Sequence, residues 1–520
     1  MKGKRNYCLI RGIFFTLFCF SSWHCGGGQE NFIGAPILPA TDTTAPEFVR
    51  VTVTGYLSLD VEFSEPLSQA STENIGNYSI RPDKVAGIAV SSAKQDSSNP
   101  SIVHLILTKP MLPMEYKLTV KNIADTSENL ILENSQSSFV GNGKVAFLTA
   151  AIGNGKLASW KDSGGVGGLA AADNICQAEA TQAGLKGDFK AWLSNSTADA
   201  KDRIGLNSGP WIRTDGFPLT ATSEDLFKGE LLVPLMYSAN GEVPANLKDA
   251  NGSFTNTNFK GERMTAHCDN WTSDSSDQGS TTGYNLGSGG EMWTSSSTTS
   301  TGCDISYRLY CFQMGQGPQV PDFKAEGKIV FMTSSTGRGD MKNWPNMPLN
   351  SPSGIAGADE ICKKHAESVG LKSFEKFKAL ISGGSQNGFA RLTSNGPWVL
   401  TNGVKIANNR TELTSGKLFT AINRTESGKV AFRANKVPIA TNIGLFNVVA
   451  NFVWTGMAND KGDSYSNGTF TCNGWLDSTS LQHGGMGAAD IGASEGWLFF
   501  PIVVVKCDQP HLSLYCFEDE

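Results

Sequence analysis

"RLYCFQ" at 308–313 and "SLYCFE" at 513–518 are nearly the same stretch, once in the middle of the chain and once at its end. In each, a Leu-Tyr-Cys-Phe core lies between polar residues. This pattern is typical of a short buried strand that carries a cysteine. Two copies indicate two domains of one kind, each ending on a cysteine that needs a partner.

The stretches upstream of these strands recur as well, in the same order. The pairs are "GKVAFLTAA" (143–151) and "GKIVFMTSS" (327–335), "GGLAAADNICQAEATQAGL" (167–185) and "SGIAGADEICKKHAESVGL" (353–371), "FKAWLS" (189–194) and "FKALIS" (377–382), "NSGPWIRTDG" (207–216) and "SNGPWVLTNG" (394–403), and "CDNWTS" (268–273) and "CNGWLD" (472–477). The sequence therefore predicts a tandem duplication, with domains at 142–315 and 327–520 and a linker at 316–326. Two copies of this size are domains rather than a solenoid.

A helix is expected near the start of each copy. In the first copy Ala171, Ile175, Ala178 and Gln182 recur near helical spacing, which predicts this helix. Asp173 is expected in the first turns, where an acid interacts favourably with the helix dipole.

The first 25 residues predict an export signal. Basic residues are followed by the apolar run "IFFTLFCFSSW", which is too short to span a bilayer. Cys25, followed by glycines, resembles the lipidated cysteine of bacterial lipoproteins, although Trp23 and His24 depart from the small residues usual there. The alternative is an ordinary secretory signal that leaves Cys25 as a free thiol. No later segment is apolar for 18 residues, so we expect the lipid on Cys25 to be the membrane anchor.

Residues 26–45 are rich in Gly, Pro and Thr and predict a flexible tether. Residues 46–141 contain short β-rich runs between turn residues, which predicts an antiparallel sandwich. The pattern "VEFSEPL…NYSI…VHLILT…YKLTVKNIAD" resembles bacterial Ig-like domains of surface proteins, which implies a spacer or stalk. His104, on an apolar run, is expected to be a surface or hydrogen-bonded residue rather than a ligand.

The charge pattern argues against nucleic acid as a partner. The net charge is −6, and no basic stripe or run of like charges is present. The composition, 39% hydrophobic and 18% charged, is that of an ordinary soluble protein.

Cysteine usage predicts a disulfide framework. Of eleven cysteines, Cys8 and Cys19 lie in the signal and Cys25 is the lipid candidate; eight remain, four in each copy, with the second and third 35 residues apart in both. An even count in an exported chain favours disulfides. The alternative, a metal site, lacks CxxC pairs and zinc-finger spacing. The residues alone leave three pairings open in each copy.

A resemblance selects among these pairings. "GLKGDFKAWLSNS…DLFKGELLVPL", then a cysteine followed at short range by Trp, then a terminal "YCF", resembles endostatin and C-type-lectin-like domains. The motifs "GIAGADEIC", "GPW", "CNGW" and "LYCF" resemble the endostatin-like domain of unknown function in leptospiral outer-surface lipoproteins, over about residues 142–518. The implied fold is an all-β Ig-like sandwich followed by two tandem disulfide-clamped α+β domains. The implied pairs are Cys176–Cys311, Cys268–Cys303, Cys362–Cys516 and Cys472–Cys507.

The resemblance also implies a function. Some relatives act as adhesins or bind plasma proteins, so we expect a lipoprotein of the outer membrane, exposed at the cell surface, that binds host extracellular-matrix or plasma proteins. The alternative is a structural or glycan-binding envelope lipoprotein. Calcium-dependent lectin motifs are absent, and Asp269, Asp274 and Asp277 are expected to form a solvated loop. We therefore expect no metal and no cofactor; the sequence does not indicate a small-molecule ligand.

Two further features bear on the function. Arg338-Gly339-Asp340 in "TSSTGRGDMKNW" is an integrin-type tripeptide, although it is absent from the first copy and tripeptides also arise by chance. No GxSxG, HExxH or phosphate loop occurs, and His267 adjoins a cysteine that is expected to be bridged. We therefore expect no catalytic residues, with an exported enzyme the least supported alternative. The recurring tryptophans are expected to pack in the core: Trp211, Trp271, Trp398 and Trp475.

Overall fold

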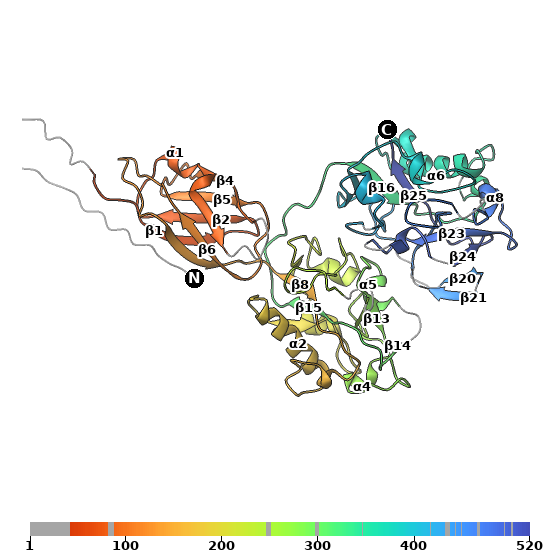
Figure 1. The fold of residues 1–520 in the computed structure, drawn as a ribbon, viewed down its shortest axis with the longest axis horizontal. Coiled ribbons are helices and arrows are strands. Elements are labelled where there is room, and N and C mark those ends of the chain that lie inside the picture. The colour runs from red at the N-terminus through yellow and green to blue at the C-terminus, as the bar shows by residue number, and fades with distance from the viewer. Residues whose placement is uncertain are drawn as a thin grey trace, which may run out of the picture. The chain divides into compact units, whose positions relative to one another are not determined.

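The computed structural model describes residues 42–81, 88–245, 251–296, 301–345, 347–416, 418–431, 437–442, 444–448, 450–464, 469–492, 495–500 and 503–520 (Figure 1). The predicted signal, Cys25 and most of the predicted tether lie outside these residues. Residues 44–520 form a compact unit that is mostly β-sheet, with few helices and four disulfides. Among the described helices, none has the length and apolar character needed to cross a membrane.

The N-terminal part folds into two antiparallel sheets, of order β1-β2-β5-β4 and β3-β6-β7. Residues alternate between buried and more exposed along β2 and β6, so each strand turns one face to the core. Leu59, Val103 and Leu118 are fully buried there. The elements are β1 (Phe48–Val53), β2 (Ser58–Phe63), α1 (Gln69–Thr72), β3 (Tyr78–Arg81), β4 (Val90–Gln95), β5 (Ile102–Leu107), β6 (Glu115–Val120) and β7 (Ser135–Val140).

The first repeat is built around a sheet of order β10-β8-β15-β9. Its "LYCF" strand, β15 (Tyr310–Gln313), is buried throughout and lies antiparallel between β8 (Val145–Leu148) and β9 (Phe189–Ala191). β10 (Ile212–Arg213) runs parallel to β8. The other elements are α2 (Gly168–Gln182), α3 (Ala200–Ile204), β11 (Gly252–Phe254), α4 (Cys268–Trp271), β12 (Gly279–Ser280), β13 (Thr282–Tyr284), α5 (Met292–Ser295) and β14 (Thr301–Gly302).

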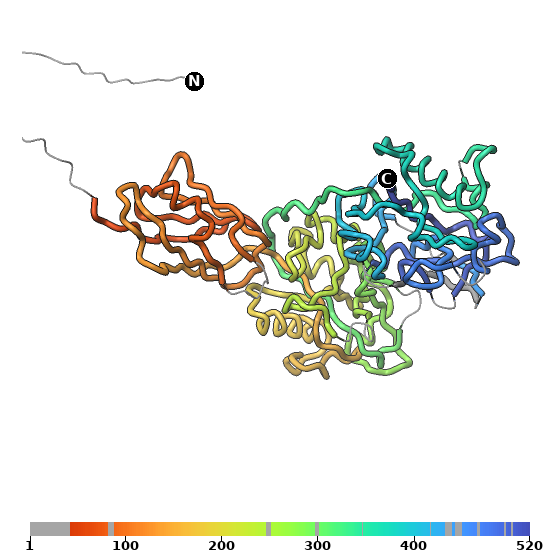
Figure 2. The backbone as a smooth tube through the Cα atoms, turned by 45° about the horizontal axis from the view of Figure 1, so that its top comes forward, coloured from red at the N-terminus to blue at the C-terminus, as the bar shows by residue number. Residues whose placement is uncertain are grey.

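The second repeat has the same central order, β17-β25-β16-β18, extended by β19. A second sheet has the order β21-β20-β24-β23-β22. Long loops connect the short strands, and Figure 2 shows the course of the backbone through them. The elements are β16 (Lys328–Met332), α6 (Gly354–Ser368), β17 (Phe377–Ala379), β18 (Trp398–Leu400), β19 (Lys405–Ala407), α7 (Arg410–Leu413), β20 (Val437–Thr441), β21 (Gly444–Val448), β22 (Phe452–Trp454), α8 (Cys472–Trp475), β23 (His483–Ala488), β24 (Val504–Lys506) and β25 (Tyr515–Glu518).

Disulfides tie each final strand to the first long helix of its own repeat. Cys176 of α2 is bonded to Cys311 of β15, and Cys362 of α6 to Cys516 of β25. The inner bridges are Cys268–Cys303 and Cys472–Cys507. These are the four pairs that the resemblance implied.

The helix lies at the predicted position, and of the four residues at helical spacing Ala171 and Ile175 are buried. Ala178 is only half-buried and Gln182 is exposed. The disulfide and the contact with β9 turn the side of α2 that carries Cys176 and Ala180 toward the core instead. Asp173 lies beyond the first turn and bonds to a strand and an arginine rather than to the helix N-terminus.

Candidate functional site

Each repeat contains an equivalent ion pair, between an aspartate on its long helix and an arginine further along the chain. In the first repeat, Asp173 Oδ1 accepts hydrogen bonds from Ala191 N (3.0 Å) and from Arg203 Nη2 (2.5 Å). In the second, Asp359 Oδ1 accepts from Ala379 N (2.9 Å) and Arg391 Nη2 (2.7 Å). Helix, strand and the following loop are therefore held together by one carboxylate in each repeat.

In each repeat a buried tryptophan is hydrogen-bonded to the serine at which the chain leaves the central sheet. Trp271 Nε1 donates to Ser194 O and Trp475 Nε1 donates to Ser382 O, both at 2.9 Å. Both indoles are fully buried, as are Trp211 and Trp398, so the expectation that these four tryptophans pack in the core is confirmed. Trp271 lies in α4 together with Cys268 of the inner disulfide. The same short helix therefore anchors both the disulfide and the loop that begins at Ser194.

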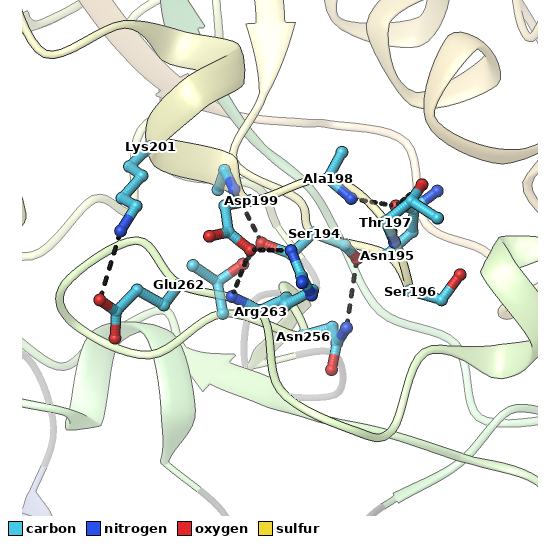
Figure 3. A network of polar contacts seen from close by, with 12 residues as sticks. Ser194, Asn195, Ser196, Thr197, Ala198, Asp199, Lys201, Asn256, Glu262 and Arg263 are labelled. Carbon is cyan, nitrogen blue, oxygen red and sulfur yellow. Dashed lines mark hydrogen bonds and ion pairs between the residues drawn. The ribbon is translucent and has the colours of Figure 1, made fainter.

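Two loops of the first repeat, 194–199 and 256–263, meet in a polar network (Figure 3). Asp199 Oδ1 accepts from the backbone N (3.1 Å) and Nη1 (3.0 Å) of Arg263, and Lys201 Nζ lies 3.2 Å from Glu262 Oε1. Within loop 194–199, the Asn195 side chain accepts from two backbone amides of the same loop. The side chain of Arg263 is 48% exposed, so the network presents charge to solvent.

Loop 256–263 contains a turn that the second repeat reproduces. Asn258 Oδ1 accepts from Lys260 N (2.9 Å) and Glu262 N (3.0 Å). In loop 457–464, Asn459 Oδ1 accepts in the same way from Lys461 N (3.0 Å) and Asp463 N (3.1 Å). The lysine in each turn is followed by a glycine with φ near 80°, a conformation that favours glycine.

The acid that ends each turn remains charged at neutral pH. Hydrogen bonds from Asn258 and then Lys201 hold the pKa of Glu262 below its ordinary value. Hydrogen bonds from Asn459 and then Asn387 do the same for Asp463. Both repeats therefore display a carboxylate at the same place in the turn.

The neighbours of these carboxylates differ between the repeats. Arg263, which pairs with Thr257 in an isolated bridge, corresponds to Ser464, which pairs with Met457. In the second repeat an amide, Asn387 Nδ2, donates to Asp463 Oδ1 at 2.8 Å. Glu262 thus has both an amide, Asn258, and a lysine, Lys201, beside it, whereas the Asp463 carboxylate accepts from two amides. Side chains of this kind around a turn can form hydrogen bonds and ion pairs with a polar partner.

These loops were not predicted from the sequence, although a signal for them exists. "NFKGE" (258–262) recurs as "NDKGD" (459–463). The match is short and lies where the copies differ in length, so it is visible only once the turn is known.

The integrin-type tripeptide lies directly beside the inner disulfide of the second repeat. Arg338 is exposed, but Gly339 is buried, and a Cβ there would lie 2.3 Å from Cys472 Sγ. The Asp340 carboxylate accepts from Lys342 N (3.1 Å) and Asn343 Nδ2 (2.5 Å). Its oxygens are therefore engaged within their own turn.

Gly339 has a counterpart in the first repeat. Gly155 N donates to Cys303 O at 2.8 Å, and Gly339 N donates to Cys507 O at 2.9 Å. A Cβ on Gly155 would lie 2.6 Å from Cys268 Sγ. The glycine of the tripeptide is thus part of the repeat, whereas Arg338 and Asp340 are not. The three acids of the predicted solvated loop, Asp269, Asp274 and Asp277, are exposed.

Residues 349–491, within the second repeat, match the family model described as "Protein of unknown function (DUF1554)". A comparison with curated proteins found no match. Among solved structures, the N-terminal part of the bacterial S-layer protein SbsC is similar at 20% identity, 22% of this chain, 27% of that chain and a TM-score of 0.17. The S-layer protein rSbsC(31-844) is similar at 21% identity, 21% of this chain, 15% of that chain and a TM-score of 0.17. This chain thus corresponds to less than a third of either structure, and at these TM-scores the likeness supports no conclusion.

Proposed function

We propose that this chain is an exported, lipid-anchored protein of the bacterial cell surface that binds a host or extracellular macromolecule. In this proposal the N-terminal sandwich is an Ig-like spacer. The two repeats are endostatin- or C-type-lectin-like heads, and Cys25 carries the lipid.

Disulfide bonding supports the exported location. All eight cysteines in the described part of the chain are paired, and such frameworks persist in oxidising compartments. A reducing cytosol would not maintain them.

The observation that carries the binding role is the pair of matched loops. A buried frame of ion pair, tryptophan and disulfide holds the same turn in both repeats, while the charged side chains around it differ. Conserved support beneath variable polar groups is the arrangement by which scaffolded loops achieve recognition. We infer that loops 194–199 and 256–263 contact the partner of the first repeat.

The test uses the chain without its first 25 residues. Its binding to a panel of extracellular-matrix proteins, plasma proteins and glycans is measured with oxidised and reduced protein, with and without chelator. The proposal expects saturable binding to a protein that is lost on reduction and unchanged by chelator. Binding to none of the panel would favour a structural envelope role, and loss on chelation would favour a metal-dependent lectin.

The loop assignment is tested with Arg263→Glu. We expect binding through the first repeat to fall at least tenfold, because the charge facing the partner is reversed. The matched control is Arg50→Glu, since Arg50 is also exposed and paired with a carboxylate, Glu62, but lies on β1. Equal losses in the two variants would rule out the loop as the binding surface.

A further inference from the structure

Three side chains in the second repeat form a continuous hydrogen-bonded chain. Ser335 Oγ lies 2.7 Å from His365 Nε2, and His365 Nδ1 lies 3.0 Å from Glu426 Oε1. Ser335 follows β16, His365 is on α6, and Glu426 is in the turn after Asn423, so three separate segments supply them. Serine, imidazole and carboxylate in this order are the groups of a nucleophilic triad.

The surroundings of Glu426 indicate where the protons of this hydrogen-bonded chain lie. Its side chain is only 6% exposed and also accepts hydrogen bonds from the backbone N (3.0 Å) and the hydroxyl of Ser334. Burial raises the pKa of Glu426, but the hydrogen bonds from His365 and Ser334 outweigh it, so the pKa lies below its ordinary value. An ionised Glu426 keeps a proton on His365 Nδ1. With that proton on Nδ1, Nε2 is the ring nitrogen that accepts the Ser335 Oγ–H.

The first repeat shows that folding does not require this chain of groups. Ala151 and Glu179 stand at the positions of Ser335 and His365. There Glu179 accepts directly from Ala150 N (2.8 Å) and Ala151 N (2.9 Å). In the first repeat one carboxylate on the helix therefore accepts hydrogen bonds from both loop amides. In the second repeat Glu426, from another segment, accepts one of the corresponding bonds, from Ser334 N.

We propose that Ser335, His365 and Glu426 form a nucleophilic centre that cleaves small carboxylic esters, an activity beyond the proposed binding function. Ser335 Oγ attacks the ester carbonyl carbon while His365 Nε2 takes its proton. The ester C–O bond breaks and His365 returns the proton to the departing alcohol. Water then attacks the acyl group on Ser335, giving its proton to His365, and the carboxylic acid leaves as Ser335 regains the proton.

The loop around Ser335 contributes to this reaction. Trp344 Nε1 donates to Ser335 Oγ at 2.9 Å and so orients the oxygen. Within the described residues the backbone N–H groups of Ser335 and Thr336 have no acceptor. The amide that follows the nucleophile is a common donor to the oxyanion in acyl transfer, and Thr336 N–H is that amide. Ser335 is half-buried, so part of this residue is open to solvent.

The test is covalent labelling with a fluorophosphonate, which phosphonylates an activated serine and expels fluoride. Peptide mass spectrometry of the whole chain is expected to find the label on Ser335 and to find at least tenfold less in Ser335→Ala and His365→Asn. Ser353→Ala is the matched control: Ser353 is an exposed serine at the start of α6 whose side chain makes no capping hydrogen bond, so the label at Ser335 persists in this variant. Thermal unfolding of each variant establishes that it is folded.

Glu426 is a positioning residue, so its test reads the pH profile. With p-nitrophenyl acetate, Glu426→Gln is expected to lower hydrolysis and to change its dependence on pH, whereas a merely structural role changes stability alone. Absence of label on Ser335 in the folded chain, or equal labelling in His365→Asn, would overturn the proposal. Neither outcome bears on binding through Arg263, so the two proposals fail separately.

Discussion

His104 couples the N-terminal sandwich to pH. Its Nδ1 lies 2.7 Å from Asp60 Oδ1 and its Nε2 lies 2.9 Å from Asp96 Oδ2. The hydrogen bond to Asp60 and then that to Asp96 raise the pKa of His104. The expectation of a hydrogen-bonded surface histidine is met, but the two carboxylates lie 44 and 8 residues away, so sequence spacing did not predict them.

Because the folded-state pKa is raised, His104 stabilises the fold fully below its unfolded pKa of about 6.5. That contribution is lost as the pH rises through the higher folded-state pKa. We therefore expect wild type to exceed His104→Gln in unfolding free energy at about pH 5.5 and to approach it at about pH 9. Urea denaturation across this range measures the difference, which is small because the imidazole is partly exposed. A difference independent of pH would contradict the assignment.

At Gly339 and Gly155, a single methyl group is expected to be costly. Alanine there forces its Cβ against the sulfur of Cys472 or Cys268, and overpacking of this kind costs about 1–3 kcal/mol. Both variants should lower the unfolding free energy by similar amounts, as measured by chemical denaturation with disulfides intact. Arg338→Ala, at the exposed position next to Gly339, is the control and should change stability by much less. A neutral Gly339→Ala would show that the backbone there moves freely.

At the scale of the elements, the outer and inner disulfides are expected to stabilise the fold by different amounts. The outer Cys176–Cys311 bridge closes 135 residues and the inner Cys268–Cys303 bridge closes 35. Chain entropy alone then gives about 5 kcal/mol for the outer and about 4 kcal/mol for the inner. Replacing each pair by serines should therefore lower the melting temperature more for the outer pair. The same order is expected for Cys362–Cys516 against Cys472–Cys507, and a reversed order in both repeats would contradict the entropy argument.

The elements also show what sequence could and could not predict. Matched motifs located both repeats and their cysteine-bearing helix, because a duplicated fold repeats its buried residues. Helical spacing alone did not predict which face of α2 is buried, since the disulfide at Cys176 also orients the helix. The sequence did not predict the cluster of Ser335, His365 and Glu426. These residues lie in three segments that share no local motif and that meet only through tertiary packing.

At the scale of the whole molecule, the question is whether the two repeats act on one partner. Arg263 in the first repeat is replaced by Ser464 in the second, so the charge beside the shared carboxylate differs. We therefore expect the repeats to bind different partners, and a chain bound through the first repeat alone to gain no avidity from the second.

The measurement compares Arg263→Glu with Lys461→Glu in the whole chain, on a surface coated with the partner. Lys461 is exposed in the turn of the second repeat. If the repeats differ, the first variant loses binding and the second binds as wild type does. If both bind one immobilised partner, each variant weakens binding through lost avidity, by a factor of about 10² to 10⁴. Equal weakening would therefore contradict the prediction. A loss confined to Arg263→Glu would mean that duplication preserved the frame while the two loop surfaces diverged.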